Sequence, residues 1–338
     1  MKPTRIIESV VGLLNGATAK SYLIYIAALG VSAPASAQEG EWERLPPPPL
    51  SNVSALALDS LGGAWAAGRG AAAYFHDGAW SVLPFPEEAA NAACHALVVD
   101  PRQTLWAGTS EGTLAFDRAG WRRYETTDSP PPSDRVLSLA TRDTSLLVGT
   151  DRGVALFDGE TWRVFTPDNS DLPDPRAAAV AFDGKGRAYL GGWIVARTTD
   201  GARWETFDDR FFGVEGLNVV AFAPDTSGAL LFATRGDYDP LRHGFTQSAI
   251  VRLAGEEFRI LTPPDARDRY RALAVDSTNT AWAGTYEGLQ FYDGREWKKA
   301  TPEGTPLSET IAVNAVEVDR FGAVWIATDN DVIVFRRE

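Results

Sequence analysis

The chain has 338 residues, 44% of them hydrophobic, and a formal net charge of −13. This composition supplies ample apolar surface for a sizeable core. The acidic balance excludes nucleic acid as a partner, because phosphate binding requires Lys and Arg to displace counterions. It also disfavours docking on an anionic membrane surface. The single Cys94 cannot form an internal disulfide, and its alanine neighbours predict a small buried thiol.

Residues 1–37 have the composition of a secretory signal. Basic residues precede an apolar run over 22–31, and Ala35-Ser36-Ala37 supplies the small residues of a cleavage site. We expect cleavage between Ala37 and Gln38, and a periplasmic or secreted protein. The apolar run is shorter than the roughly 20 residues of a spanning helix, so no stable membrane span is expected in the mature form. An uncleaved anchor is the alternative, because the region before the apolar run is long and contains Glu8.

Residues 38–338 contain an internal repeat of about 42 residues. Equivalent positions are separated by 41, 41, 42, 42, 51 and 43 residues, and they are Trp65, Trp106, Leu147, Tyr189, Leu231, Trp282 and Trp325. A second aromatic follows 15 residues later in five copies, so ten of the eleven Trp residues are in phase with the repeat. The exception is Trp193.

Each copy predicts four short strands. The first alternates towards an acidic turn, as in 53–59 and 313–319, and the turn reads Asp-x-x-Gly in four copies. Asp opens such turns through its side chain, and Gly accepts the left-handed conformation that closes them. The "WAGT" segment and the "GTLAFD" segment predict the second and third strands, and an Asp-Gly tip leads to the fourth. Four-stranded units of this length that repeat radially are β-propeller blades.

The two ends of the repeat region predict how the ring closes. After Trp325 the next outer aromatic would fall at position 340, beyond Glu338, so the seventh copy lacks its fourth strand. Upstream, the segment 39–45 carries Trp42 nearly in phase. We therefore predict an all-β, seven-bladed propeller closed by an N-terminal strand that completes the last blade, which removes the exposed edges. The prolines at 47–50 suit the loop that follows this strand.

The pattern V-x-x-L-x-x-D-x-x-G-x-x-W-x-G-T-x-x-G-L-x-x-F-D-G-x-x-W resembles the two-component-regulator propeller repeat. The segments 94–121, 136–162 and 270–297 match it best, with "LWAGTSEGTLAFD", "LLVGTDRGVALFD" and "AWAGTYEGLQFYD". Copies four and five are degenerate. The resemblance implies a periplasmic sensor-type propeller, a class that often stands ahead of a membrane span and a histidine kinase. Because this chain has neither element downstream, the resemblance implies a separate signalling or transport partner.

Two motifs that suggest catalysis are better explained by the repeat. The segment 108–112 fits the G-x-S-x-G pattern of a hydrolase elbow, but the equivalent slots 149–153 and 284–288 lack the serine. We expect a hairpin turn there. His76, His95 and His243 lie in three different copies and could meet only at the central channel, so they are interpreted as solvated or core side chains. No catalytic residue, metal site or cofactor is predicted.

Variation among the copies identifies a candidate binding face. Turns between second and third strands, and loops leading into first strands, emerge on one face because successive strands are antiparallel. The varied residues there are Trp193, Arg235, Arg69, Asp151, Tyr286 and Asp329 in the turns, and Asn52, Asp134, Arg176, Asn218 and Arg269 in the loops. The insertion in copy five adds Asp237, Asp239, Arg242 and His243. An aromatic among polar groups suits a sugar or a peptide side chain.

The leading hypothesis is a non-catalytic exported propeller that binds a glycan, peptide or protein on this face, in a sensor-like or scaffold role. One alternative is a propeller enzyme, either a lyase or a metal-dependent lactonase or hydrolase, with its site in the channel. Another is a purely structural assembly subunit. Function must be argued from the site, because this fold hosts several activities.

Overall fold

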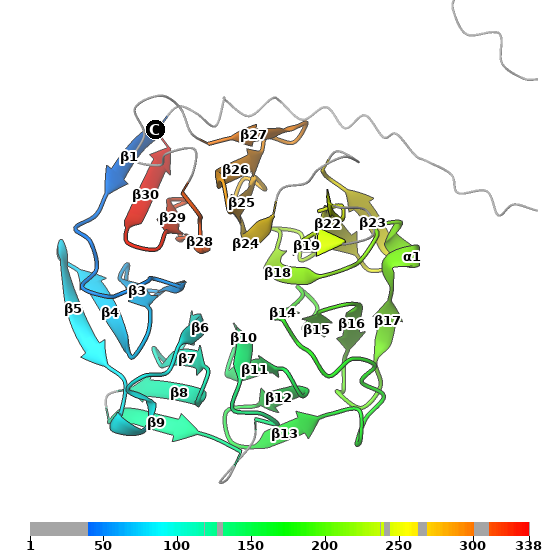
Figure 1. Cartoon of the computed structure of the whole chain (residues 1–338), viewed down its shortest axis with the longest axis horizontal. Coiled ribbons are helices and arrows are strands. Elements are labelled where there is room, and N and C mark those ends of the chain that lie inside the picture. The colour runs from blue at the N-terminus through cyan, green and yellow to red at the C-terminus, as the bar shows by residue number, and fades with distance from the viewer. Residues whose placement is uncertain are drawn as a thin grey trace, which may run out of the picture. The chain divides into compact units, whose positions relative to one another are not determined.

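Each copy of the repeat folds into one antiparallel four-stranded sheet in the computed structural model, which describes residues 40–117, 119–126, 131–236, 238–239, 244–262, 269–300 and 311–337. Seven such sheets stand around a central axis, each with its first strand innermost and its fourth strand outermost (Figure 1). The predicted seven-bladed β-propeller is therefore confirmed.

The first four blades follow the predicted order along the chain. Blade 1 contains β2 (Ala55–Leu58), β3 (Ala64–Ala67), β4 (Ala71–His76) and β5 (Ala79–Pro84). Blade 2 contains β6 (Cys94–Val99), β7 (Leu105–Thr109), β8 (Gly112–Asp117) and β9 (Gly120–Tyr124). Blade 3 contains β10 (Val136–Arg142), β11 (Ser145–Thr150), β12 (Val154–Phe157) and β13 (Trp162–Phe165). Blade 4 contains β14 (Ala179–Phe182), β15 (Ala188–Gly191), β16 (Val195–Thr198) and β17 (Glu205–Phe207).

The remaining blades include the insertion and the closure. Blade 5 contains β18 (Val219–Pro224), β19 (Leu230–Thr234), β22 (Ile250–Ala254) and β23 (Glu257–Ile260), with the small hairpin β20 (Tyr238–Asp239) and β21 (Gly244–Phe245) inserted. Blade 6 contains β24 (Tyr270–Val275), β25 (Ala281–Thr285), β26 (Gly288–Tyr292) and β27 (Trp297–Lys299). Blade 7 contains β28 (Ala315–Val318), β29 (Val324–Ala327), β30 (Val332–Arg337) and β1 (Gly40–Arg44). Two short helices, η1 (Glu87–Ala89) and α1 (Asp209–Phe212), lie in loops between blades.

The ring closes as predicted, through β1. This strand pairs with β30 from Gly40↔Arg337 to Arg44↔Ile333, so the two ends of the described chain meet in one blade. Trp42 lies opposite Phe335 with their ring centroids 4.7 Å apart. Pairing with β1 covers the outer edge of β30, which would otherwise be open to edge-to-edge association.

The hydrophobic core lies between the blades. Seven clusters of buried apolar side chains each join two neighbouring blades, including blades 7 and 1. At the blade 2–blade 3 seam, for example, Trp106 packs with Leu139 and Val148. Each blade therefore depends on both neighbours for burial of its two faces, as expected for a closed radial repeat.

The acidic turns account for the spacing between Asp and Trp in the repeat. In blade 2 one carboxylate oxygen of Asp100 accepts the backbone N–H groups of Arg102 and Thr104, both at 2.9 Å. Its other oxygen accepts the indole N–H of Trp106 at 3.1 Å. The same indole bond recurs from Trp282 to Asp276 and from Trp325 to Asp319. These aspartates satisfy buried polar groups and are structural.

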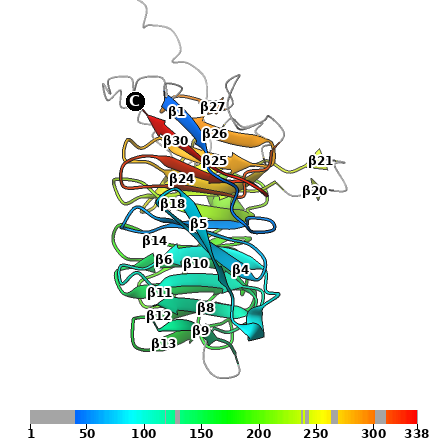
Figure 2. The same cartoon turned by 90° about the vertical axis from the view of Figure 1, so that its left-hand side faces the viewer.

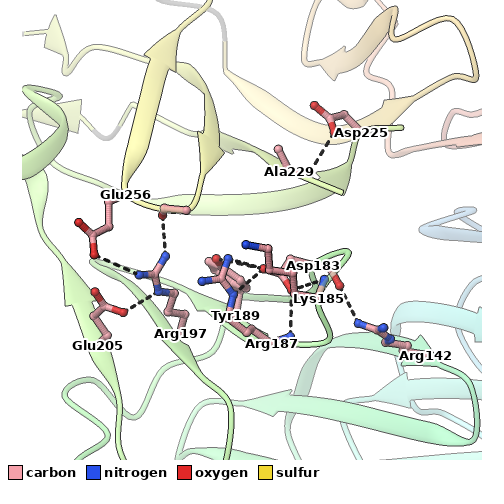
Figure 3. A network of polar contacts seen from close by, with 11 residues as sticks. Arg142, Asp183, Lys185, Arg187, Tyr189, Arg197, Glu205, Asp225, Ala229 and Glu256 are labelled. Carbon is pink, nitrogen blue, oxygen red and sulfur yellow. Dashed lines mark hydrogen bonds and ion pairs between the residues drawn. The ribbon is translucent and has the colours of Figure 1, made fainter. Parts of the chain in front are cut away.

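The degenerate blades 4 and 5 replace the indole bond with ion pairs. In blade 4, Asp183 accepts the Arg187 guanidinium at 2.7 Å, and in blade 5 Asp225 accepts Arg252 at 2.6 Å. Figure 3 shows the blade 4 network, in which Arg197 also donates to Glu205 and to the backbone oxygen of Gly255. Because Gly255 belongs to blade 5, Arg197 joins the two degenerate blades.

Candidate functional site at one mouth of the channel

The first strands of all seven blades line a central channel. A cavity of about 210 Å³ runs along it, bordered by segments of β2, β6, β10, β14, β18, β24 and β28. Most lining side chains are Ala, Leu, Val or Phe. The side chains that line the channel are therefore mostly apolar.

A second cavity of about 240 Å³ opens at the mouth on the predicted binding face. We call it the basic cup, and its lining residues are His95, Arg135, Leu137, Arg176, Ala178, Asn218, Val220 and Arg235. They come from blades 2, 3, 4 and 5. Among the predicted site residues, the structure thus brings together Arg176, Asn218 and Arg235.

Main-chain hydrogen bonds hold the cup residues in place. The N–H of Arg235 donates to the backbone oxygen of Asn218 at 2.8 Å, which fixes the β19 turn against the loop leading into β18. The Nδ1 atom of His95 lies 2.7 Å from the backbone oxygen of Val136. A carbonyl oxygen can only accept, so Nδ1 carries the proton and Nε2 remains available to a ligand.

Trp193 lies beside the cup, in the turn between β15 and β16. Its side chain is 51% exposed, the only Trp among the large hydrophobic side chains exposed in the described residues. Gly192 permits this position, because a Cβ there would lie 2.5 Å from the backbone oxygen of Arg176. The oxygen of Gly192 in turn accepts the N–H of Val219, next to Asn218, at 2.9 Å. The turn of Trp193 therefore joins the loops that carry Arg176 and Asn218.

Two of the cup residues with polar side chains, Arg135 and His95, were not predicted as binding residues from the sequence. Arg135 has the same position in blade 3 as Arg176 in blade 4, since each precedes a fully buried residue, Val136 or Ala177. The sequence argument selected the neighbouring Asp134 instead. The carboxylate of Asp134 accepts the N–H of Thr126 at 2.8 Å and belongs to the loop rather than the cup. Counting back from the buried residue would have identified Arg135.

The other residue is His95, which was interpreted as a solvated or core side chain. It is exposed and occupies the first lining position of blade 2 in the channel. Its equivalents in the other blades include Ser54, Leu137 and Ala178. A histidine at this position is thus specific to one copy, which the sequence alignment of copies could have indicated.

The remaining predicted residues lie elsewhere around the ring. Arg69 donates to the backbone oxygen of Asn91 at 2.8 Å, and Asp329 accepts the side-chain amide of Asn314 at the same distance. The ring of Tyr286 lies under the guanidiniums of Arg269 and Arg271, at 4.1 and 4.4 Å. These residues belong to blades 1, 6 and 7 and do not line the cup.

Two further predicted residues, Asn52 and Asp151, lie in described loops, and four lie in the insertion. Asn52 is exposed in a left-handed conformation with φ 62°, and one carboxylate oxygen of Asp151 is buried without a hydrogen-bond partner. The side chains of Asp237, Asp239, Arg242 and His243 lie outside the described residues. The backbone of the β20–β21 hairpin, which includes Asp239, stands out from one face of the ring (Figure 2).

Glu317 is the one carboxyl group lining the channel cavity among the described residues. It lies opposite Trp325, at a position that holds Ala in five other blades and Val98 in blade 2. Burial raises the pKa of Glu317 from 4.5 to about 7. Part of this group is therefore protonated near neutral pH.

The motifs set aside in the sequence have structural roles. Residues 108–112 form the β7–β8 hairpin, in which the Thr109 hydroxyl donates to the oxygen of Gly112 at 2.8 Å. Cys94 is buried, and burial raises the pKa of its thiol to about 12. His76 is exposed at the tip between β4 and β5, on the opposite side of the blade from the cup. Within the described part of the chain, no group of three or more His, Cys, Asp or Glu side chains is placed to hold a metal ion.

Comparisons with known proteins support the fold. No family model and no curated relative matches this chain. Among solved structures, it is similar to the extracellular domain of the hybrid two-component system BT4673 from B. thetaiotaomicron, with TM-score 0.68 and 16% identity over 87% of this chain. The match covers only 39% of that chain. The chain thus spans well under half of the length of this sensor structure.

Two other solved structures are also similar to this chain. Virginiamycin B lyase from Staphylococcus aureus matches with TM-score 0.71 and 11% identity, over 89% of this chain and 100% of that one. YCF48 bound to D1 peptide matches with TM-score 0.63 and 13% identity, over 91% and 98% of the two chains. At these identities the likeness shows the β-propeller fold alone. In the described residues, no helix has the length and apolar character needed to cross a membrane.

Proposed function

We propose that this chain is an exported, non-catalytic β-propeller that binds a ligand on the face that carries Trp193 and the basic cup. The ligand is a glycan, peptide or protein outside the cytoplasm, and a separate signalling or transport partner uses the binding event. The observation that carries the proposal is a half-exposed tryptophan beside a cavity lined by three arginines from neighbouring blades. Concave sites with an aromatic surface and a few converging polar groups are typical of ligand binding.

Two further points support this face over the opposite one. The opposite face carries the Asp turns, whose aspartates are engaged with backbone N–H groups, indoles or arginines. Its composition therefore follows from turn geometry. The similar structures include an extracellular domain of a two-component system and a peptide complex, which fit a recognition role.

The test is a screen of the purified protein on a defined array of glycans and peptides, followed by affinity measurements on the best binder. Loss of an aromatic anchor commonly costs about 2 kcal/mol, which is roughly thirtyfold in affinity. We expect this loss in Trp193→Ala and a comparable loss in Arg235→Ala, with unchanged melting temperatures. Lys185→Ala and Arg320→Ala in the opposite turns are the matched controls.

Equal weakening by the control substitutions, or none by Trp193→Ala, would show that this face does not bind the ligand. Chemical conversion of the captured compound would replace the proposal with the lyase alternative, for which the structural similarity to virginiamycin B lyase provides the scaffold. Binding only to other copies of the chain would favour a structural assembly subunit.

A further inference from the structure

We propose that the basic cup binds an oxyanion, that is, a carboxylate, sulfate or phosphate group carried by the ligand. The inference rests on the proposed ligand binding at this face and names the chemistry of the bound group. Each guanidinium presents five N–H donors in a planar fork that matches such groups. The side chains of Arg135, Arg176 and Arg235 border one cavity of about 240 Å³.

The charge balance around the cup is the first argument. No carboxylate lines the cup among the described residues, although the chain has 45 acidic and 32 basic residues. No ion pair joins Arg135, Arg176 or Arg235 to an acidic side chain within the described ranges. Three like charges around a small cavity repel one another, and a bound anion relieves that repulsion.

Several other arginines of this chain form close ion pairs. Those inside the blades, such as Arg187, Arg197 and Arg252, each contact a carboxylate at 2.6 Å. The cup arginines stand in a chain rich in acidic groups, but among the described residues none of them has such a partner. This contrast indicates that their positions serve a group from outside the chain rather than the stability of a blade.

The nearest acidic neighbour is already engaged. Asp174 precedes Arg176 and accepts the backbone N–H of that residue at 2.9 Å. One of its carboxylate oxygens also lies close to the backbone of Gly192. Asp174 therefore stabilises the loop that carries Arg176, and the side chain of Arg176 borders the cavity.

The floor of the cup strengthens binding. Leu137, Ala178 and Val220 form its apolar part, where the cup meets the channel. Electrostatic attraction is stronger where water is partly excluded. Asn218 also borders the cavity and adds a polar side chain to its rim. An anion in the cup thus lies beside Trp193, where a ring or chain attached to it can contact the indole.

The experiment uses the full-length exported protein and three probes: inorganic phosphate, sulfate and glucuronate, each titrated at constant ionic strength against chloride. Binding is measured by calorimetry and by the rise in melting temperature. We expect saturable binding of at least one probe, weakened at least tenfold in the double variant Arg176→Gln/Arg235→Gln. The double variant Lys185→Gln/Arg320→Gln on the opposite face removes the same charge and should bind as the wild type does.

The three probes distinguish the source of the anion. Preference for glucuronate supports a carboxylate, whereas preference for sulfate or phosphate supports an ester of that acid. If the double variant in the cup does not fold, the single variant Arg135→Gln, at an exposed position, is measured in its place and should also weaken binding of the probe. Protection of Trp193 from iodide quenching by the bound probe, read as the difference from Trp193→Phe, locates the site independently.

The inference is overturned if no probe binds more tightly than chloride, or if cup and control variants lose binding equally. These results are separable from those of the array screen. If the array screen finds a ligand whose capture depends on Trp193 but no probe binds, the oxyanion proposal is wrong and the proposed function of the face stands. Anion binding in the cup with capture independent of Trp193 retains the oxyanion site and removes the proposed function of the face.

Discussion

The closure of the ring can be tested by truncating the aromatic side chain of its last strand. Trp42 is half-buried on β1 and packs against Phe335, and it contributes to the core between blades 6 and 7. Trp80 is the matched comparison, half-buried on the outer strand of blade 1, where its indole donates to the oxygen of Pro46 at 2.7 Å. If β1 closes the ring, Trp42→Ala should destabilise the protein as much as Trp80→Ala does.

The expected size follows from the loss of a large aromatic side chain. Replacing a buried Trp by Ala costs about 3 kcal/mol, a substantial share of a typical stability of about 5–15 kcal/mol. For a domain of this size that corresponds to a fall in melting temperature of about 5 °C. Differential scanning calorimetry on both variants measures the fall. Trp193→Ala, at an exposed position, should leave the melting temperature unchanged.

An unchanged melting temperature in Trp42→Ala, with a clear fall in Trp80→Ala, would refute the closure argument. It would mean that β1 is not required for the stability of blade 7. Removing residues 40–44 should have a larger effect than Trp42→Ala, because it also deletes the hydrogen bonds to β30 and leaves that strand as an unpaired edge.

Two other predictions concern the channel and the amino terminus. The folded state favours the protonated form of Glu317, because burial raises its pKa from 4.5 to about 7. The folded protein is therefore not destabilised by this group below pH 4.5, and it loses stability relative to the unfolded chain as the pH rises through 7. The free energy of unfolding of Glu317→Gln should therefore increasingly exceed that of the wild type as the pH rises, by about 3 kcal/mol at pH 8. Urea unfolding measures this difference, and a difference that stays constant from pH 4 to 8 would contradict the prediction. The exported protein should begin at Gln38, which N-terminal sequencing checks; a product that begins near Met1 would support the membrane-anchor alternative.

The fold was predictable because its determinants recur. Trp106, Trp282 and Trp325 repeat in phase because each donates to an aspartate six residues earlier, in the turn that joins the first two strands of its blade. Closure was predictable because the seventh copy lacks a fourth strand, and the chain has one additional strand before the first copy. Because the blade pattern occurs in seven copies, a feature that is unclear in one copy can be identified from the others.

The cup was only partly predictable, because its residues do not recur. Arg135 and Arg176 occupy equivalent positions, but the loops before them differ in sequence. The sequence pattern predicted Asp134, the residue before Arg135, which does not line the cup. β10 begins with an irregularity in register between Val136 and Ser138, which β14 lacks. Spacing alone therefore did not align the two loops. Which side chains meet across four blades is set by the ring and not by any one copy.

The degeneracy of copies four and five has a physical explanation in the same terms. Both lack the anchor tryptophan and its indole bond, and both use ion pairs instead, Arg187 with Asp183 and Arg252 with Asp225. A partly buried ion pair requires a well-placed partner of opposite charge. It does not require the apolar space that an indole fills. These two blades also carry Trp193 and Arg235 on the opposite side. A blade held by its own ion pairs and by Arg197 can depart from the consensus in its turns, since its position in the ring no longer depends on the repeated aromatic. The irregular copies are therefore where a propeller can vary its turns without loss of closure, and in this chain the exposed tryptophan and two of the three cup arginines, Arg176 and Arg235, lie there.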